Sequence, residues 1–160
     1  MIKTAWRIVQ AHLAAEAFSG EGAKNFPGRW NHRGTAMVYA AGSLSLAVLE
    51  MLVHLGAAES LRRYISFTVK FEESLCRDFP PKDLPADWAA DPPPDSARAL
   101  GTAWAKNNAS LVLAVPSAVI RSETNYLINP GHPDFSGLEI GPARPPAFDQ
   151  RFSRLKEILS

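Results

Sequence analysis

The stretch Gly28–Gly56 reads GRWNHRGTAMVYAAGSLSLAVLEMLVHLG and joins a glycine-rich loop, a short apolar strand and an apolar helix. From Leu46 to Gly56 the expected helix is apolar except at Glu50 and His54. Burying a carboxylate costs free energy unless a partner compensates its charge. Packing alone therefore explains Glu50 poorly, and we interpret it as the centre of a functional site. An ordinary i, i+4 pair with His54 is the alternative interpretation.

The composition limits the classes of protein to which the chain can belong. It has 160 residues, 46% of them hydrophobic, enough for one globular domain with its own core. The net charge of +1 and the absence of a long basic block argue against direct nucleic-acid binding. No apolar run approaches the roughly 18 residues of a membrane span. The single cysteine, Cys76, fits a reducing compartment. We expect one cytoplasmic domain, residues 1–160, with no direct membrane contact.

Hydrophobic periodicity predicts an α+β fold, a compact mixed sheet with flanking helices. Strands are expected at Thr4–Gln10, Ala36–Ala41, Arg62–Phe71 and Leu111–Val115. The main helix is expected at Leu44–Leu55, with Ser43 as its N-cap, Gly56 as its stop and apolar packing around most of its circumference. A second helix should begin at Asp95 or Ser96 and end near Lys106.

The remaining segments are predicted to complete this domain. The proline-rich segment at about 79–95 should wrap over the surface, anchored by Leu84 and Trp88, rather than link two domains. Ala118–Ile120 should resume the strand that Pro116-Ser117 interrupts, and the segment 123–135 reads as turns. Residues 138–140 and 146–149 resemble closing edge strands, followed by a helix from about Arg151.

Several common chemistries lack their motifs. There is no G-K-[ST] phosphate loop, and Asn25 stands where a dinucleotide fingerprint needs its third glycine. Four scattered histidines and one cysteine lack metal-ligand spacing, so we expect no metal. Ser117, His132 and Asp134 would suit a serine hydrolase by residue type, but no G-x-S-x-G elbow surrounds the serine.

The residues that remain suit glycosyl chemistry on a nucleotide. Guanidinium groups such as those of Arg7 and Arg29 bind phosphates bidentately. The ring of Tyr39 can stack on a flat heteroaromatic group. The carboxylate of Glu50 can stabilise a developing cationic sugar. A cationic nicotinamide leaves without a general acid or a metal, which makes a nicotinamide nucleotide a suitable substrate.

Seven short motifs together resemble the RES-domain family, which is named for its arginine, glutamate and serine. They are W-R-I at 6–8, G-E-G-A at 20–23, G-R-W-N-x-x-G at 28–34, V-Y-A-A at 38–41, S-L-A-V-L-E at 45–50, V-P-S at 115–117 and N-Y-L-I-N-P-x-H-P-D-F at 125–135. The resemblance covers nearly the whole chain. It implies a fold similar to that of ADP-ribosyltransferase toxins, in a single RES domain over residues 1–160.

The resemblance also implies roles for individual residues. Glu50 would be the catalytic carboxylate, with Tyr39 and Arg29 as catalytic partners. The NAD+ substrate would be bound by these two residues together with Arg7, Gly28, Asn31, Ser117, Asn125 and His132. Arg7 and Arg29 would hold phosphates or ribose, Tyr39 would line the nicotinamide pocket, and Ser117 would bond the ribose or the amide. Asn125 and His132 would brace the site.

The resemblance implies a toxin that depletes cellular NAD+ by cleaving the nicotinamide–ribose bond, by hydrolysis or phosphorolysis. Transfer of ADP-ribose to a protein is the first alternative, and a non-catalytic module that binds a DNA-binding partner is the second. The implied partner is a helix-turn-helix antitoxin of the Xre type that covers the active site. The ADP-ribose acceptor, the stoichiometry with the antitoxin and a dimer of the toxin are left open.

Overall fold

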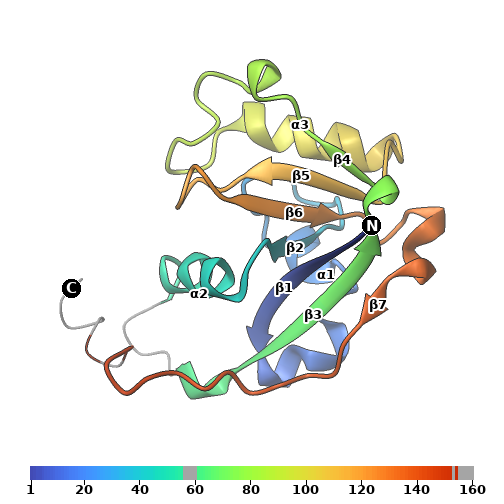
Figure 1. Cartoon of the computed structure of the whole chain (residues 1–160). Helices are drawn as coiled ribbons and strands as arrows, with labels where there is room; N and C mark the ends of the chain where they lie inside the picture. The colour runs from blue at the N-terminus through green and yellow to red at the C-terminus, as the bar shows by residue number, and fades with distance from the viewer. Residues whose placement is uncertain (56–60, 153, 155–160) are drawn as a thin grey trace.

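A mixed seven-stranded sheet forms the centre of the protein, as a computed structural model of residues 1–55, 61–152 and 154 describes it. The strand order is β4-β5-β6-β2-β1-β3-β7 (Figure 1), and neighbours are antiparallel except for the parallel pair β4 and β5. The strands are β1 Ile2–Gln10, β2 Val38–Ala41, β3 Tyr64–Glu72, β4 Cys76–Asp78, β5 Val112–Pro116, β6 Thr124–Ile128 and β7 Glu139–Ile140.

Three α-helices and five short 3-10 helices flank this sheet in the described part of the chain. The α-helices are α1 Glu21–Asn25, α2 Leu44–Leu52 and α3 Asp95–Lys106. The 3-10 helices are η1 Ala11–Glu16, η2 Leu61–Arg63, η3 Glu73–Leu75, η4 Pro81–Asp83 and η5 Pro133–Gly137. The predicted α+β class is confirmed. Within the residues that the structure describes, no helix has the length and apolarity needed to cross a membrane.

The sheet is divided into two halves where β1 meets β2. These two strands pair through Trp6 and Ala41, whereas β1 and β3 pair from Ile2↔Glu72 to Gln10↔Tyr64. Figure 1 shows β5, β6 and β2 on one side of this point and β1, β3 and β7 on the other. The short β1–β2 junction therefore positions one half-sheet against the other.

One face of the sheet carries both larger helices. Paired residues point to the same face, so Tyr39, Ala41, Asn125 and Leu127 share it. Near the junction, α2 packs on this face through Leu46, which clusters with Ala41 and Trp6. Further along, α3 packs there in a cluster of Trp30, Met37, Ala97, Trp104, Ala105, Leu113, Val115 and Leu127. Tyr39 and Asn125, two residues of the expected site, thus lie on the helix-covered face.

The proline-rich segment lies against this same cluster. The rings of Trp88 and Trp30 stack with centroids 6.0 Å apart and an interplanar angle of 21°. Leu84 and Phe79 pack against the cluster as well. The two anchors expected from the sequence, Leu84 and Trp88, therefore hold the segment on the surface of the sheet and α3.

The chain after β5 differs from the sequence-based expectation. Residues 118–120 are bends and not strand, because the Ser117 hydroxyl accepts hydrogen bonds from the amides of Val119 and Ile120. The returning strand is instead β6, in a segment expected as turns, where it pairs with both β5 and β2. Residues 146–149 form no strand, whereas the expected edge at 138–140 is confirmed as β7. The helix expected from about Arg151 lies mostly outside the described residues.

Helix α2 is shorter and more exposed than the sequence predicts. Ser43 is its N-cap as expected, with Oγ accepting from the amide of Leu46 at 3.0 Å. The helix ends at Leu52 rather than Leu55, and the expected stop at Gly56 lies outside the described residues. The prediction of packing around most of the helix was wrong, because α2 contacts the sheet on one side. Its outer side exposes Leu44, Leu49 and Val53, the last by 58%.

Replacing Gly101 by alanine should destabilise the fold. A Cβ at this position in α3 would overlap the carbonyl oxygen of Trp30, a backbone atom that cannot move without shifting the loop. We expect the free energy of unfolding to fall by about 1–3 kcal/mol, measured by urea denaturation. Gly22→Ala in α1 is the matched control, because a Cβ there meets nothing within 4 Å. Equal stabilities of the two variants would contradict the packing described here.

Candidate functional site

Glu50 points toward the sheet because of its position on α2. It lies four residues after Leu46 and three after Ala47, both buried against the sheet, and residues at these spacings share one helix face. The helix therefore directs the carboxylate toward the ends of β5 and β6. His54, the alternative partner, is exposed and forms no bond with Glu50.

One oxygen of the Glu50 carboxylate is fixed by two neutral donors. Oε1 accepts from Ser117 Oγ at 2.7 Å and from Asn125 Nδ2 at 2.6 Å. The described residues provide no donor to Oε2. No cation pairs with this carboxylate among the described salt bridges. Within the described part of the protein, the carboxylate is therefore held through Oε1 by uncharged groups alone.

The Ser117 side chain is bonded to the Glu50 carboxylate and does not point into open space. Its hydroxyl donates to Glu50 and accepts from the amides of Val119 at 3.1 Å and Ile120 at 3.0 Å. The residue is fully buried. A hydroxyl has one proton and two acceptor positions, all of which are occupied here. The expected direct bond from Ser117 to ribose or amide is therefore not prepared in this structure.

Asn125 carries an unsatisfied atom next to the carboxylate. Its Nδ2 donates to Glu50, but its Oδ1 is the one buried side-chain nitrogen or oxygen in the described part of the chain that lacks a partner. A buried polar atom without a hydrogen bond costs about 1–3 kcal/mol. An unpaired buried atom of this kind needs an explanation, and one possible explanation is a functional role. This cost singles out the surroundings of Glu50.

Asn31 organises the loop that carries Arg29. It is fully buried, and its Oδ1 accepts from the amide of Gly28 at 2.9 Å and from the hydroxyl of Tyr39 at 2.6 Å. Its Nδ2 donates to the carbonyls of Ala23, His32 and Thr35 at 2.8–3.2 Å. Asn31 therefore shapes the loop, as expected, but offers no atom to a ligand.

Tyr39 reaches this loop from β2. Its hydroxyl donates to Asn31 and accepts from the amide of Trp30 at 3.0 Å. Burial raises the pKa of Tyr39 above its ordinary value, so the phenol stays protonated. A Cβ at Gly28 would lie 2.8 Å from the Tyr39 ring, so the loop approaches the ring where only glycine fits.

Further contacts hold the loop against α3. Arg98 Nε donates to the carbonyl of Gly28 at 3.2 Å, and the amide of His32 donates to Thr102 Oγ1 at 2.9 Å. The His32 ring also pairs with Asp95 at 2.6 Å. The sequence reasoning missed Arg98 and Thr102. Their spacing of four residues on one helix face was the available signal.

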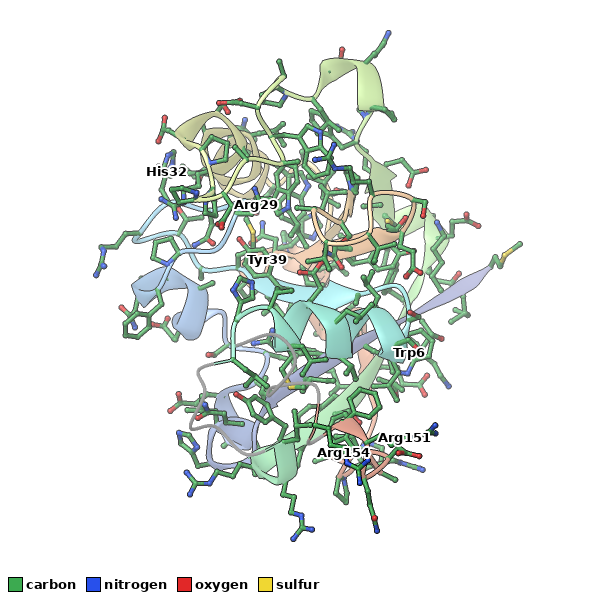
Figure 2. The ribbon with its side chains drawn as sticks, turned by 90° about the vertical axis from the view of Figure 1, so that its left-hand side faces the viewer. Trp6, Arg29, His32, Tyr39, Arg151 and Arg154 are labelled. Carbon is green, nitrogen blue, oxygen red and sulfur yellow. The ribbon has the colours of Figure 1, made fainter. Side chains whose placement is uncertain are left out.

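Arg29 connects the loop to the proline-rich segment. Its Nη1 donates to the carbonyls of Trp88 at 2.9 Å and Ala90 at 2.7 Å. Figure 2 shows Arg29 beside Tyr39, with His32 further out. Because Nη1 is engaged by carbonyls alone, the guanidinium remains a cation without an acidic partner among the described residues.

Arg7 bridges the two half-sheets. From β1, its Nη1 donates to the carbonyl of Tyr39 on β2 at 2.8 Å, and its Nε donates to the carbonyl of Ala17. Burial lowers the pKa of Arg7 to about 10, so it remains charged at neutral pH. Strand alternation directs its side chain away from the face that carries Trp6 and α2. The structure thus engages Arg7 with backbone rather than placing it beside Glu50.

The sheet register brings the Tyr39 loop and the Glu50 carboxylate together. Asn125 on β6 pairs with Ala41 on β2, two residues along from Tyr39. Diagonal neighbours on one face of a sheet lie roughly 7–8 Å apart. Arg29, Tyr39 and Glu50 therefore belong to one region of the helix-covered face, assembled around β2 and β6.

His132 lies away from this region. It follows the C-terminal end of β6, whereas Asn125 lies near the strand's start. There it caps η5 by accepting from the amide of Asp134 and lines a cavity of about 510 Å³ with Cys76 and Ser110. The structure does not bring His132 together with Glu50. Among the described residues, no three His, Cys, Asp or Glu side chains gather as metal ligands would.

These features define a small α+β domain with a single central carboxylate, held by neutral donors and set beside an arginine-bearing loop. The chain belongs to the RES domain family, whose sequence model matches residues 4–149. This match confirms the resemblance found in the sequence motifs.

Two relatives illustrate this membership. The chain is 40% identical over 130 residues to "Toxin Res" of Yersinia enterocolitica serotype O:8 / biotype 1B, which covers 81% of this chain and 86% of that protein. It is 39% identical over 159 residues to "Prs ADP-ribosylating toxin" of Sphingobium sp. strain YBL2, which covers 96% of this chain and 99% of that protein.

A solved structure shares the fold. The crystal structure of the Mycobacterium tuberculosis MbcT–MbcA toxin–antitoxin complex contains a chain that superposes with a TM-score of 0.70 at 21% identity. The match covers 99% of this chain and 89% of that one. The α+β architecture is therefore that of a protein with a known structure.

Replacing Ser117 by alanine should destabilise the turn that supports Glu50. The change leaves the amides of Val119 and Ile120 without their acceptor and removes one of the two donors to Glu50 Oε1. We expect a loss of about 1–3 kcal/mol in the free energy of unfolding, measured by chemical denaturation. Ser122→Ala, in the same turn but exposed, should leave stability unchanged. A Ser117→Ala variant as stable as that control would refute the role assigned to the hydroxyl.

Proposed function

We propose that this protein is the toxin of a toxin–antitoxin pair and that it cleaves the nicotinamide–ribose bond of NAD+. The observation that carries the proposal is the Glu50 carboxylate, whose Oε1 is held by Ser117 and Asn125 while no described residue donates to Oε2. Membership of the RES domain family and relatives named as toxins support the biological role.

The chemistry follows from the charges in the reaction. The C1′–N1 bond breaks, and its electron pair neutralises the pyridinium, so nicotinamide leaves as a neutral molecule without being protonated. The ribosyl fragment becomes cationic at C1′. An anionic carboxylate that is fixed before the reaction stabilises this charge without reorganising. Glu50 suits this role because two donors orient it and no cation among the described residues pairs with it.

The neighbouring residues would bind the rest of the substrate. The Arg29 guanidinium has no acidic partner among the described residues and suits the diphosphate, which arginine can contact with more than one N–H group. The Tyr39 ring, between that arginine and the Glu50 region, suits stacking on a flat base. Arg7 would contribute by holding β1 against β2, so that the site keeps its shape.

The ADP-ribosyl group needs an acceptor to complete the reaction. Water gives ADP-ribose and releases a proton, and inorganic phosphate gives the 1″-phosphate. These two acceptors make NAD+ loss the toxic event and are our first proposal. Transfer to a protein nucleophile is the second candidate, and the Sphingobium relative, named an ADP-ribosylating toxin, favours it.

We further propose that an antitoxin binds over the site. The structural neighbour was solved as a toxin–antitoxin complex. The exposed apolar side chains Leu49 and Val53 flank Glu50 on α2 and would supply contact area. The near-zero net charge suits a partner that makes the DNA contacts itself, as the implied Xre-type antitoxin would.

Replacing Glu50 by glutamine tests the catalytic role. Glutamine keeps the shape and accepts the bonds from Ser117 and Asn125 through its amide oxygen, but it has no negative charge. We expect the rate of NAD+ loss with purified protein to fall by about 100-fold or more, at unchanged melting temperature. The exposed Glu123→Gln variant is the control and should retain the wild-type rate. Full turnover by Glu50→Gln would overturn the mechanism.

The acceptor can be identified by analysing products of labelled NAD+. Free ADP-ribose is expected in phosphate-free buffer, and ADP-ribose 1″-phosphate should appear only when phosphate is an acceptor. Label on a protein band after adding bacterial lysate would favour the second candidate. No NAD+ consumption by partner-free protein in any of these mixtures would refute both and favour the non-catalytic binding module.

A further inference from the structure

The Tyr39 hydroxyl, in a candidate active site, makes two hydrogen bonds within the protein, one as donor and one as acceptor. Its proton goes to Asn31 Oδ1 at 2.6 Å, and it accepts from the Trp30 amide at 3.0 Å. A tyrosine that transfers a proton during a reaction must direct its O–H group at the reacting atom. This O–H group points to a side chain that is completely buried.

Asn31 has all its hydrogen-bonding positions occupied. Both acceptor positions of Oδ1 are used, by Tyr39 and the Gly28 amide. The two hydrogens of Nδ2 serve three backbone carbonyls, so one hydrogen is shared. Turning the Tyr39 O–H group toward a ligand would remove one of the two donors to the buried Asn31 Oδ1. The free energy that such a change costs keeps the hydroxyl where it is.

We propose that Asn31 is a positioning residue that acts through Tyr39, and that Tyr39 meets the substrate with its ring and not with its hydroxyl. We call this connection of the Asn31 side chain, the Tyr39 hydroxyl and the amides of Gly28 and Trp30 the Asn31 latch. It fixes the backbone on both sides of Arg29 and holds the ring against Gly28. The substrate contact in this inference rests on the proposed NAD+ cleavage, whereas the latch itself does not.

The latch accounts for the residue types in the G-R-W-N segment. Gly28 is required because a side chain would collide with the Tyr39 ring at 2.8 Å. Position 31 needs a side chain with both donors and acceptors, which aspartate lacks and asparagine has. Arg29 lies between the two amides that the latch fixes, so its guanidinium starts from a rigid backbone. The latch thus prepares the loop before any substrate binds.

Tyr39→Phe is the appropriate test, because Asn31→Ala would leave three carbonyls without a donor and risk unfolding. Phenylalanine keeps the ring and removes only the bond to Asn31 and the acceptor for Trp30. We expect KM for NAD+ to rise about fivefold, the effect of losing one hydrogen bond from the loop, while kcat changes by less than about threefold. The pH profile of kcat should keep its shape.

Tyr126→Phe is the matched control. Tyr126 lies on β6 but faces the opposite side of the sheet, with its ring edge-on to Phe71 at 5.4 Å. Its hydroxyl makes no hydrogen bond with a described residue, so both kinetic constants should stay at wild-type values. Tyr39→Leu should remove activity that Tyr39→Phe retains, because leucine has no ring to stack.

A second measurement does not depend on activity. In Tyr39→Phe the Trp30 amide loses its acceptor, so its hydrogen exchange, followed by NMR, should accelerate about tenfold or more. The Gly42 amide, which donates to the carbonyl of Thr124, should exchange at its original rate. An unchanged Trp30 rate would overturn the latch.

The outcomes separate this inference from the proposed function. If the wild-type protein consumes NAD+ and Tyr39→Phe loses about 100-fold or more in kcat, the hydroxyl takes part in proton transfer and the inference is wrong. If the wild-type protein consumes no NAD+, the proposed function fails. The Trp30 exchange rate then decides alone whether the latch exists.

Discussion

The relation between the two half-sheets depends on Arg7, a cation that the fold surrounds with carbonyl groups instead of a carboxylate. A charged group taken out of water is costly unless hydrogen bonds replace its hydration. The carbonyls of Ala17 and Tyr39 provide them, and β1 and β2 pair otherwise through Trp6 and Ala41. Moving β2 away from β1 would leave the Arg7 guanidinium without its bond to the Tyr39 carbonyl. This bond therefore opposes separation of the two strands. The position of Tyr39, and with it the loop that it anchors, follows from this bond.

The candidate site shows a division between polar atoms that are saturated and polar atoms that are free. Ser117 and Asn31 have all their hydrogen-bonding positions occupied, and the proton of the Tyr39 hydroxyl is donated to Asn31. Glu50 Oε2, Asn125 Oδ1 and the remaining N–H groups of Arg29 form no hydrogen bond with a described residue. The saturated atoms fix geometry, and the free ones are those available to a ligand. The family's sequence motifs include residues that fix the geometry of the site and residues that could contact a ligand. Only the contacts in the structure show to which of these two groups a residue belongs.

Much of this arrangement could be predicted from local patterns, and the failures have physical causes. The Ser43 cap, the alternation in β3 and the apolar run of β5 are local signals, and each marked its element. β6 was missed because Thr124 and Asn125 read as turn formers, although the Asn125 side chain instead bonds Glu50 on α2. Residues 118–120 were wrongly predicted as a strand because they are apolar. Their apolar pattern does not reveal the hydrogen bonds to the Ser117 hydroxyl that bend the chain there. Glu50 was identified from the cost of a lone carboxylate on an apolar helix. Its partners lie 67 and 75 residues away, beyond the reach of any local pattern.

That separation has a consequence for synthesis. A ribosome makes the chain from its N-terminus, so α2 emerges long before the strands that hold its carboxylate. Pairing between distant segments waits until both exist, and contacts of high sequence separation form slowly. Until Asn125 has left the exit tunnel, Glu50 has neither of its donors and the face of the sheet has no β6. An unfinished chain therefore lacks this arrangement of Glu50, which is assembled only after β6 has been made.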